Sequence, residues 1–85
     1  MSTYFLYMLR CADNTLYTGI TTDIARRLKE HNLGEKWAKY TRMRRPVELI
    51  YEETHPTRSE ASKREYSIKQ LSRSEKENLI QNHVK

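Results

Sequence analysis

Residues 4–32, YFLYMLRCADNTLYTGITTDIARRLKEHN, decide the fold that the sequence predicts. Two runs rich in aromatic and branched side chains, Tyr4–Arg10 and Leu16–Ile20, flank the turn-forming segment Ala12–Thr15. This pattern is typical of a β-hairpin. Because the first run carries apolar side chains on both of its faces, we expect it to be a central strand of the sheet.

Two tyrosines, Tyr7 and Tyr17, lie one on each predicted strand. Successive side chains of a strand point to opposite faces, so the two rings share a face only if the connecting loop has an odd number of residues or a bulge shifts the register. An even loop without a bulge would separate them. The hairpin register therefore decides whether both hydroxyls belong to one site.

A helix is predicted from about Asp23 to Leu33. Thr21 and Thr22 are N-cap candidates, Asp23 suits the positive end of the helix, and Gly34 is placed as a C-cap. The helix supplies charged and titratable side chains directly after the hairpin.

One face of this helix is apolar. At about 100° per residue, Ile24, Leu28 and His31 fall within roughly 60° of one another and form the buried stripe. Arg27 lies at the border of the stripe, whereas Arg26 points to solvent. If one arginine of the pair works beside the hairpin, we expect it to be Arg27.

The second half of the chain predicts one strand and two helices. Val47–Tyr51 has strand character, and two capping boxes, Thr57–Glu60 and Ser72–Glu75, begin helices expected at Arg58–Gln70 and Arg73–Asn82. We therefore expect a single α/β domain over residues 1–85, of the α+β type: a small three-stranded antiparallel sheet in β-β-α-β-α-α order, with the helices packed around it.

Glu65 is the acidic residue that the predicted helix caps do not explain. It shares a face with Ala61 and Ile68, which should point toward the sheet. A buried glutamate is costly unless it is paired or binds a cation. Two interpretations are open: a salt bridge to an arginine such as Arg27 or Arg64, or a metal ligand.

Composition narrows the class of protein. The net charge is +5 and the pI about 9.5, which favours an anionic partner such as nucleic acid, although solubility alone also explains a basic chain. With Cys11 as the only cysteine, no intramolecular disulfide can form, and a reducing compartment is expected. No window resembles a signal peptide or a membrane span. We expect a cytoplasmic protein that does not enter membranes.

The segment KWAKYTRMRR, residues 36–45, is basic, lacks acids and contains two aromatic residues. Such a segment contacts phosphates and stacks bases, or else forms a solvated loop with its aromatic residues on the core. The candidate nucleic-acid-binding residues are Lys36, Lys39, Tyr40, Arg42, Arg44 and Arg45.

Together these residues resemble the GIY-YIG endonuclease superfamily, with the closest likeness to its small standalone YhbQ-like bacterial branch. The two signature triplets of the family correspond to Leu6-Tyr7-Met8, which keeps the tyrosine, and Tyr17-Thr18-Gly19, which keeps the tyrosine and glycine. The helix arginine of the family corresponds to Arg27, and the His or Tyr that follows it corresponds to His31. The metal-binding glutamate on a later helix corresponds to Glu65.

The resemblance implies metal-assisted hydrolysis of a nucleic-acid phosphodiester. Glu65 and water molecules would hold one Mg²⁺ or Mn²⁺ ion. Tyr17 would be the general base and Tyr7 would orient the attacking water. Arg27 would neutralise charge on the phosphoryl oxygens, and His31 would assist proton transfer or phosphate contact.

We therefore expect a metal-dependent endonuclease, with DNA as the substrate and a role in DNA repair or processing. The alternative is a non-catalytic or weakly active nucleic-acid-binding module of the same fold. The default oligomeric state is a monomer.

Overall fold

The computed structural model describes residues 3–33 and 44–82. The helices and strands follow the predicted order: β1 (Tyr4–Arg10), β2 (Leu16–Thr21), α1 (Ile24–Leu33), β3 (Glu48–His55), α3 (Arg58–Lys69) and α4 (Arg73–Gln81). The strands form a three-stranded antiparallel sheet in the order β2-β1-β3. The expected fold class is confirmed, and β1 is the central strand as predicted.

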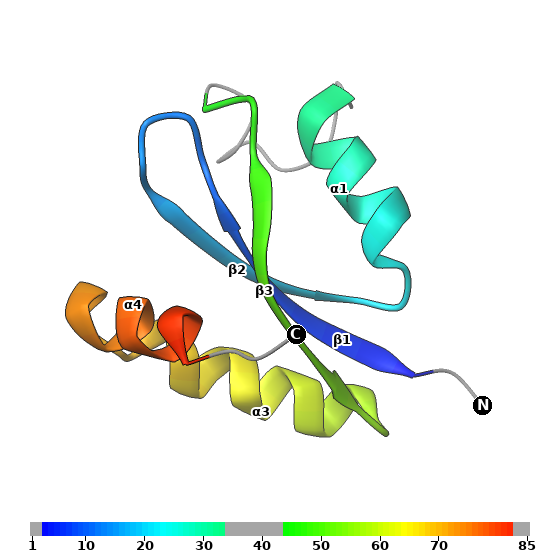
Figure 1. Ribbon diagram of the computed structural model, residues 1–85. Coiled ribbons are helices and arrows are strands. Elements are labelled where there is room, and N and C mark those ends of the chain that lie inside the picture. The colour runs from blue at the N-terminus through cyan, green and yellow to red at the C-terminus, as the bar shows by residue number, and fades with distance from the viewer. Residues whose placement is uncertain (1–2, 34–43, 83–85) are drawn as a thin grey trace.

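The sheet separates two apolar clusters. Figure 1 shows α1 on one face of the sheet, and α3 and α4 on the other. On the α3 and α4 face the buried core consists of Leu6, Met8, Tyr51 and Ile68. On the α1 face it consists of Tyr7, Leu9, Cys11 and Val47. Because successive side chains of β1 alternate between the faces, this one strand supplies both cores.

The hairpin turn follows from its polar residues. Asp13 Oδ1 accepts hydrogen bonds from the backbone N–H and the hydroxyl of Thr15, at 3.1 and 2.6 Å. Asn14 has a φ of 69°, the left-handed conformation that asparagine tolerates better than most residues. Its N–H donates to the carbonyl of Cys11 at 2.8 Å. The turn is thereby fixed by local contacts.

β3 is longer than predicted. The sequence predicts a strand over Val47–Tyr51, whereas β3 spans Glu48–His55 and pairs along the whole of β1. Its second half is polar, but Glu53 has partners: its Oε1 accepts from Arg64 Nε of α3 at 2.8 Å and lies 2.8 Å from His55 Nε2. Burial of a carboxylate on a strand is tolerated when its hydrogen bonds are satisfied. The predicted end at Tyr51 is therefore wrong.

The other boundaries agree with prediction or differ from it by one residue. Thr57 Oγ1 accepts from the backbone N–H of Glu60 at 3.2 Å, which caps α3. At the start of α4 the capping box is complete, because Glu75 N–H donates to Ser72 Oγ and Ser72 N–H donates to Glu75 Oε1. The corrected boundaries are Thr21 for the end of β2, Ile24 for the start of α1, Lys69 for the end of α3 and Gln81 for the end of α4.

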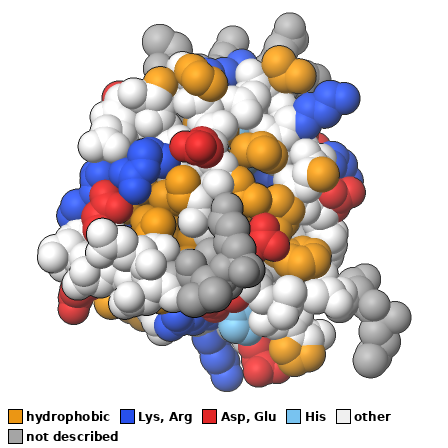
Figure 2. All heavy atoms as spheres, viewed as in Figure 1, with side chains coloured by type: hydrophobic (Ala, Val, Ile, Leu, Met, Phe, Trp, Pro, Cys, Tyr) orange, Lys and Arg blue, Asp and Glu red, His pale blue; other side chains and the backbone are white. Residues whose placement is uncertain are grey.

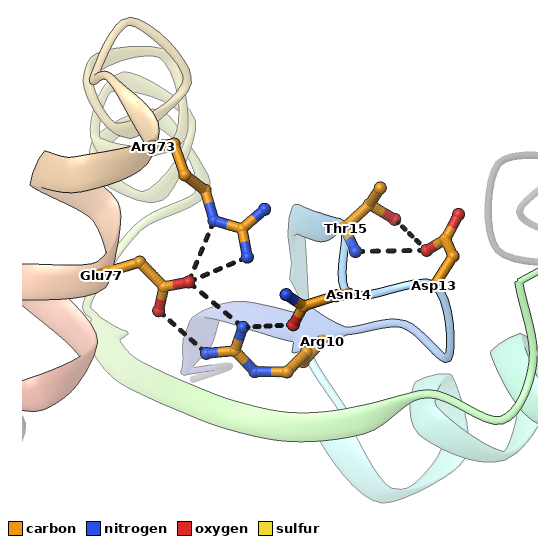
Figure 3. Close-up of polar contacts among 6 residues, drawn as sticks. All are labelled: Arg10, Asp13, Asn14, Thr15, Arg73 and Glu77. Carbon is orange, nitrogen blue, oxygen red and sulfur yellow. Dashed lines mark hydrogen bonds and ion pairs between the residues drawn. The ribbon is translucent and has the colours of Figure 1, made fainter.

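A surface ion cluster attaches α4 to the hairpin (Figure 3). Arg10 Nη2 and Nη1 donate to the two carboxylate oxygens of Glu77 at 2.9 and 3.2 Å, and Arg73 Nε donates to the same carboxylate at 2.9 Å. Arg10 also donates to Asn14 Oδ1 at 2.9 Å. These hydrogen bonds lower the pKa of Glu77 to about 2. α4 itself contains no fully buried residue, so this cluster adds to the packing of its partly buried Leu79 and Ile80 against the core.

Charged and hydrophobic side chains occupy different parts of one face of the molecule. On the face drawn in Figure 2, hydrophobic side chains gather near the centre, and lysine, arginine, aspartate and glutamate side chains lie mostly around them.

Within residues 3–33 and 44–82, no helix is both long enough and apolar enough to cross a membrane.

Candidate functional site

The hairpin register brings the two tyrosines to one face. Arg10 pairs with Leu16, so the loop comprises residues 11–15, an odd number, and the predicted condition is met. Tyr17 pairs with Leu9, which lies on the same face of β1 as Tyr7. The two tyrosine rings are 6.3 Å apart between centroids, and both face α1.

α1 places His31 against both rings. The helix is capped by Asp23, whose Oδ1 accepts from the backbone N–H of Arg26 at 3.0 Å. Thr21 holds this cap, because its hydroxyl oxygen accepts from the N–H of Asp23 at 3.1 Å. From this start the helical period directs His31 to the sheet, where it is only 1% exposed. Asp23 rather than Thr21 or Thr22 is therefore the N-cap.

Tyr7 and His31 form a buried polar pair. Tyr7 Oη lies 2.9 Å from His31 Nε2, and the Tyr17 ring meets His31 edge-on, with 4.9 Å between centroids. Burial lowers the pKa of His31 to about 4, with a further lowering from the charge of Arg27. Burial and the neighbouring Tyr17 raise the pKa of Tyr7. At neutral pH both partners are therefore uncharged, and His31 is able to accept a hydrogen bond.

Gly19 provides the space for this pair. It lies opposite Tyr7 in the hairpin. A Cβ atom at position 19 would lie 2.7 Å from Tyr7 Oη and 2.8 Å from Tyr7 Cζ, which is well inside van der Waals contact. The glycine of the second sequence triplet thus allows the Tyr7 ring to cross β2.

Arg27 lies at the edge of the site, as its position on the helix predicts. Its side chain is 30% exposed, and its Nη1 forms an ion pair with Glu30 Oε1 at 3.4 Å. The charge of Arg27 lowers the pKa of both Tyr7 and His31, whereas that of Glu30 raises both. Glu30 was not a candidate on sequence grounds. Its position three residues after Arg27 is the sequence pattern that could have identified it as an ion-pair partner of Arg27.

Glu65 lies on α3, on the face of the sheet opposite α1, so it does not share the face of Tyr7 and Tyr17. It lies between Ala61 and Ile68, both fully buried, and its charge raises the pKa of Tyr7. Its Oε2 forms an ion pair with Lys69 Nζ at 3.1 Å. The predicted arginine partner is therefore replaced by a lysine.

The two arginines offered as partners of Glu65 have other acidic neighbours. Arg64 forms its ion pair with Glu53, at 2.8 Å, and Arg27 forms its ion pair with Glu30. A lysine one turn after Glu65 on the same helix reaches the carboxylate at a favourable i,i+4 spacing.

The basic segment is only partly described. Lys36, Lys39, Tyr40 and Arg42 lie outside the described residues. Arg44 Nε forms an ion pair with Asp13 Oδ2 at 2.9 Å, and Arg45 Nε donates to the backbone carbonyl of His31 at 2.6 Å. Both arginines thus have contacts within the protein. Phosphate binding by this segment remains a prediction.

Comparison with known proteins identifies the family of this arrangement. A model of the GIY-YIG catalytic domain matches residues 3–78. The chain belongs to the GIY-YIG family. UPF0213 protein DP2720 of Desulfotalea psychrophila is 64% identical over 77 residues, which cover 91% of this chain and 70% of the relative. UPF0213 protein SERP0126 of Staphylococcus epidermidis is 52% identical over 81 residues, 95% of this chain and 98% of the relative.

A solved structure has the same GIY-YIG architecture. The solution NMR structure of protein EF2693 from E. faecalis is 42% identical and superposes with a TM-score of 0.66, covering 100% of this chain and 91% of that chain. The expected resemblance to the small YhbQ-like branch of the GIY-YIG nucleases is therefore confirmed.

The donor atoms near this GIY-YIG site suit a hard cation with few protein ligands. In the described part of the chain, no three or more His, Cys, Asp or Glu side chains gather closely enough to hold a metal ion. Glu65 offers a carboxylate whose side chain is 24% exposed. Mg²⁺ keeps several of its water molecules and binds through one or two carboxylates, so Glu65 together with water fits such an ion.

Proposed function

We propose that the chain is a divalent-metal-dependent endonuclease that hydrolyses nucleic-acid phosphodiester bonds, with DNA as the expected substrate. One observation supports this above all: the hairpin and α1 bring Tyr7, Tyr17 and His31 into mutual contact, with Arg27 at the edge of the same group. Two phenols and an imidazole beside a guanidinium suit phosphoryl chemistry. A role in DNA repair or processing and a cytoplasmic location also remain predictions.

We assign removal of the proton from the attacking water to Tyr17. Tyr17 is half-buried, whereas Tyr7 is only 3% exposed. Water therefore reaches Tyr17 more easily. A phenol accepts a proton only when it is ionised, and nearby positive charge favours that form. Arg27 and a bound cation would supply this charge.

The Tyr7–His31 pair positions Tyr17. The neutral imidazole contacts both phenol rings, so it fixes their orientation within the apolar face. With its pKa near 4, His31 is unprotonated at neutral pH and is ready to accept a hydrogen bond from Tyr7.

Arg27 and Glu65 act on charge at the phosphate. The guanidinium of Arg27 would donate to the phosphoryl oxygens, which gain negative charge during hydrolysis. Glu65 would hold Mg²⁺ or Mn²⁺, and such an ion supplies positive charge at the scissile phosphate and the leaving oxygen. Lys69, now paired with Glu65, would have to share or release the carboxylate.

A nicking assay tests this proposal. Supercoiled plasmid and branched DNA are incubated with Mg²⁺ or Mn²⁺ and the wild-type chain, Tyr17→Phe or Glu65→Gln. Loss of a general base typically lowers the rate by about 100- to 10,000-fold, so Tyr17→Phe should be nearly inactive. Glu65→Gln should also be nearly inactive, because it lacks the carboxylate that would hold the metal ion. Glu48→Gln is the matched control, because Glu48 is an exposed carboxylate at the hairpin end of the sheet.

Two results would reject the proposal. Wild-type protein that binds DNA but cleaves none of the substrates is not an endonuclease on them. Glu65→Gln or Tyr17→Phe protein that cleaves as fast as Glu48→Gln protein shows that the site residues are wrongly assigned.

A non-catalytic nucleic-acid-binding module is the second candidate. The observation in its favour is the ion pair between Glu65 and Lys69, which satisfies the carboxylate without a metal ion. This candidate predicts DNA binding without cleavage, and the same binding by wild-type and Tyr17→Phe protein.

A further inference from the structure

A basic hollow lies at the β2 edge of the sheet, next to the proposed catalytic tyrosine. It has a volume of about 240 Å³ and is lined by Leu16, Tyr17 and Thr18 of β2, by Lys69 at the end of α3 and by Lys76 of α4. β2 is an outer strand of the described sheet. The hollow therefore has lysines from two different helices beside the strand that carries Tyr17.

The two lysines differ in their partners. Lys69 Nζ lies 3.1 Å from Glu65 Oε2, and its side chain is 52% exposed. Lys76 is half-buried. Among the ion pairs formed by residues 3–33 and 44–82, none includes Lys76. With no acidic partner among these residues, the Lys76 ammonium can be paired by a bound anion.

We propose that this hollow binds a backbone phosphate of the nucleic-acid strand, with Lys69 and Lys76 as the donors. Lysine is a common point-charge binder of phosphate. A phosphate held here would place the strand alongside Tyr17, so that a neighbouring phosphodiester reaches the site. The choice of a nucleic acid as the ligand rests on the proposed function.

Lys69 links phosphate binding to the state of Glu65. In the structure Lys69 balances the charge of Glu65, so a phosphate in the hollow competes with the carboxylate for the same ammonium. Removal of the carboxylate charge should therefore strengthen phosphate binding when no metal is present. The Glu65→Gln variant, which should not cleave, is thus expected to bind DNA more tightly than wild type.

Metal-free DNA binding tests the proposal. The affinity for a short fluorescent DNA duplex is measured by anisotropy in EDTA over a range of salt concentrations. Loss of one phosphate contact lowers the slope of log K against log salt by about 0.9, which corresponds to roughly eightfold in affinity near 0.1 M salt. Lys69→Gln and Lys76→Gln should each show this loss, and Glu65→Gln should show a gain.

Lys63→Gln is the matched control. Lys63 is exposed on the same helix as Lys69, six residues earlier and so roughly 120° away around the helix. Each lysine variant lowers the net charge equally, from the +5 of the wild-type chain. Lys63→Gln should therefore change the affinity less than twofold. Circular dichroism of every variant establishes that it is folded.

The outcomes separate this inference from the proposed function. If Lys69→Gln and Lys76→Gln bind like Lys63→Gln, or if the wild type does not bind DNA in EDTA, the phosphate site is wrong even when Glu65-dependent cleavage occurs. If both variants lose affinity but the wild type never cleaves, the phosphate site stands and the endonuclease is rejected.

Discussion

Replacement of Gly19 by alanine tests the geometry on which the tyrosine site depends. The new methyl group would lie 2.7 Å from Tyr7 Oη and 2.8 Å from Tyr7 Cζ, against an ordinary separation of about 3.5–4.0 Å. Tyr7 is 3% exposed and is hydrogen-bonded to His31, so its ring has little room to move. Gly19 does not have a positive φ, so the backbone accepts alanine and the cost is steric.

The expected change in the free energy of unfolding of Gly19→Ala is the sum of two opposing effects. Overpacking of a buried site typically costs about 1–3 kcal/mol. The lower entropy of the unfolded chain returns about 0.4–1 kcal/mol where alanine suits the backbone. We expect Gly19→Ala to lower the free energy of unfolding by roughly 1–2 kcal/mol. For a domain of this size, each kcal/mol lowers Tm by about 4–8 °C.

A double-mutant cycle identifies the source of this cost. Urea unfolding, followed by circular dichroism, is measured for Gly19→Ala in the wild-type and Tyr7→Leu backgrounds. Leucine lacks the Oη and Cζ atoms, so the alanine should lose most of its cost there, with only the 3.2 Å approach to Tyr17 Cε2 remaining. Equal destabilisation in both backgrounds, or none in the wild type, would refute the packing argument.

Two further predictions concern buried polar groups. The pKa of His31 falls from 6.5 to about 4 on folding, so the unfolded chain binds more protons than the folded chain between these pH values. The free energy of unfolding should therefore fall as the pH is lowered through this window, by up to roughly 3 kcal/mol. An NMR titration checks this, and an imidazole midpoint near 6.5 in the folded protein would contradict it. Glu53→Gln removes the charged partner of Arg64 and His55 and should destabilise the domain by about 1–3 kcal/mol; a thermal midpoint equal to that of the wild type would show that the cluster contributes little.

Local patterns account for most of the fold. The polar turn and the parity of the loop fix how Tyr7 and Tyr17 face, because both depend only on residues 4–21. The second half of β3 was missed for the opposite reason. Glu53 becomes acceptable in a strand through Arg64, which lies on α3, and a pattern confined to β3 does not contain that partner.

Sequence patterns predicted which candidate site residues face the core. They did not predict which of these residues contact one another. The helical period placed His31 and Glu65 on buried stripes, and the structure confirms burial for His31 and partial burial for Glu65. The helical period does not reveal that His31 meets Tyr7, since that contact depends on how α1 docks on the sheet. Lys69 and Lys76 read as ordinary solvated charges until α3 and α4 bring them to the edge of β2.

The ion cluster around Glu77 makes the attachment of α4 sensitive to the solvent. α4 has no fully buried residue, and its contacts to Arg10 are between partly exposed charges, which dissolved salt screens. Local opening of a native protein begins where apolar burial is least. α4 carries Lys76, one wall of the basic hollow. Salt therefore acts on this hollow in two ways, by screening its ammonium groups and by loosening the helix that holds one of them.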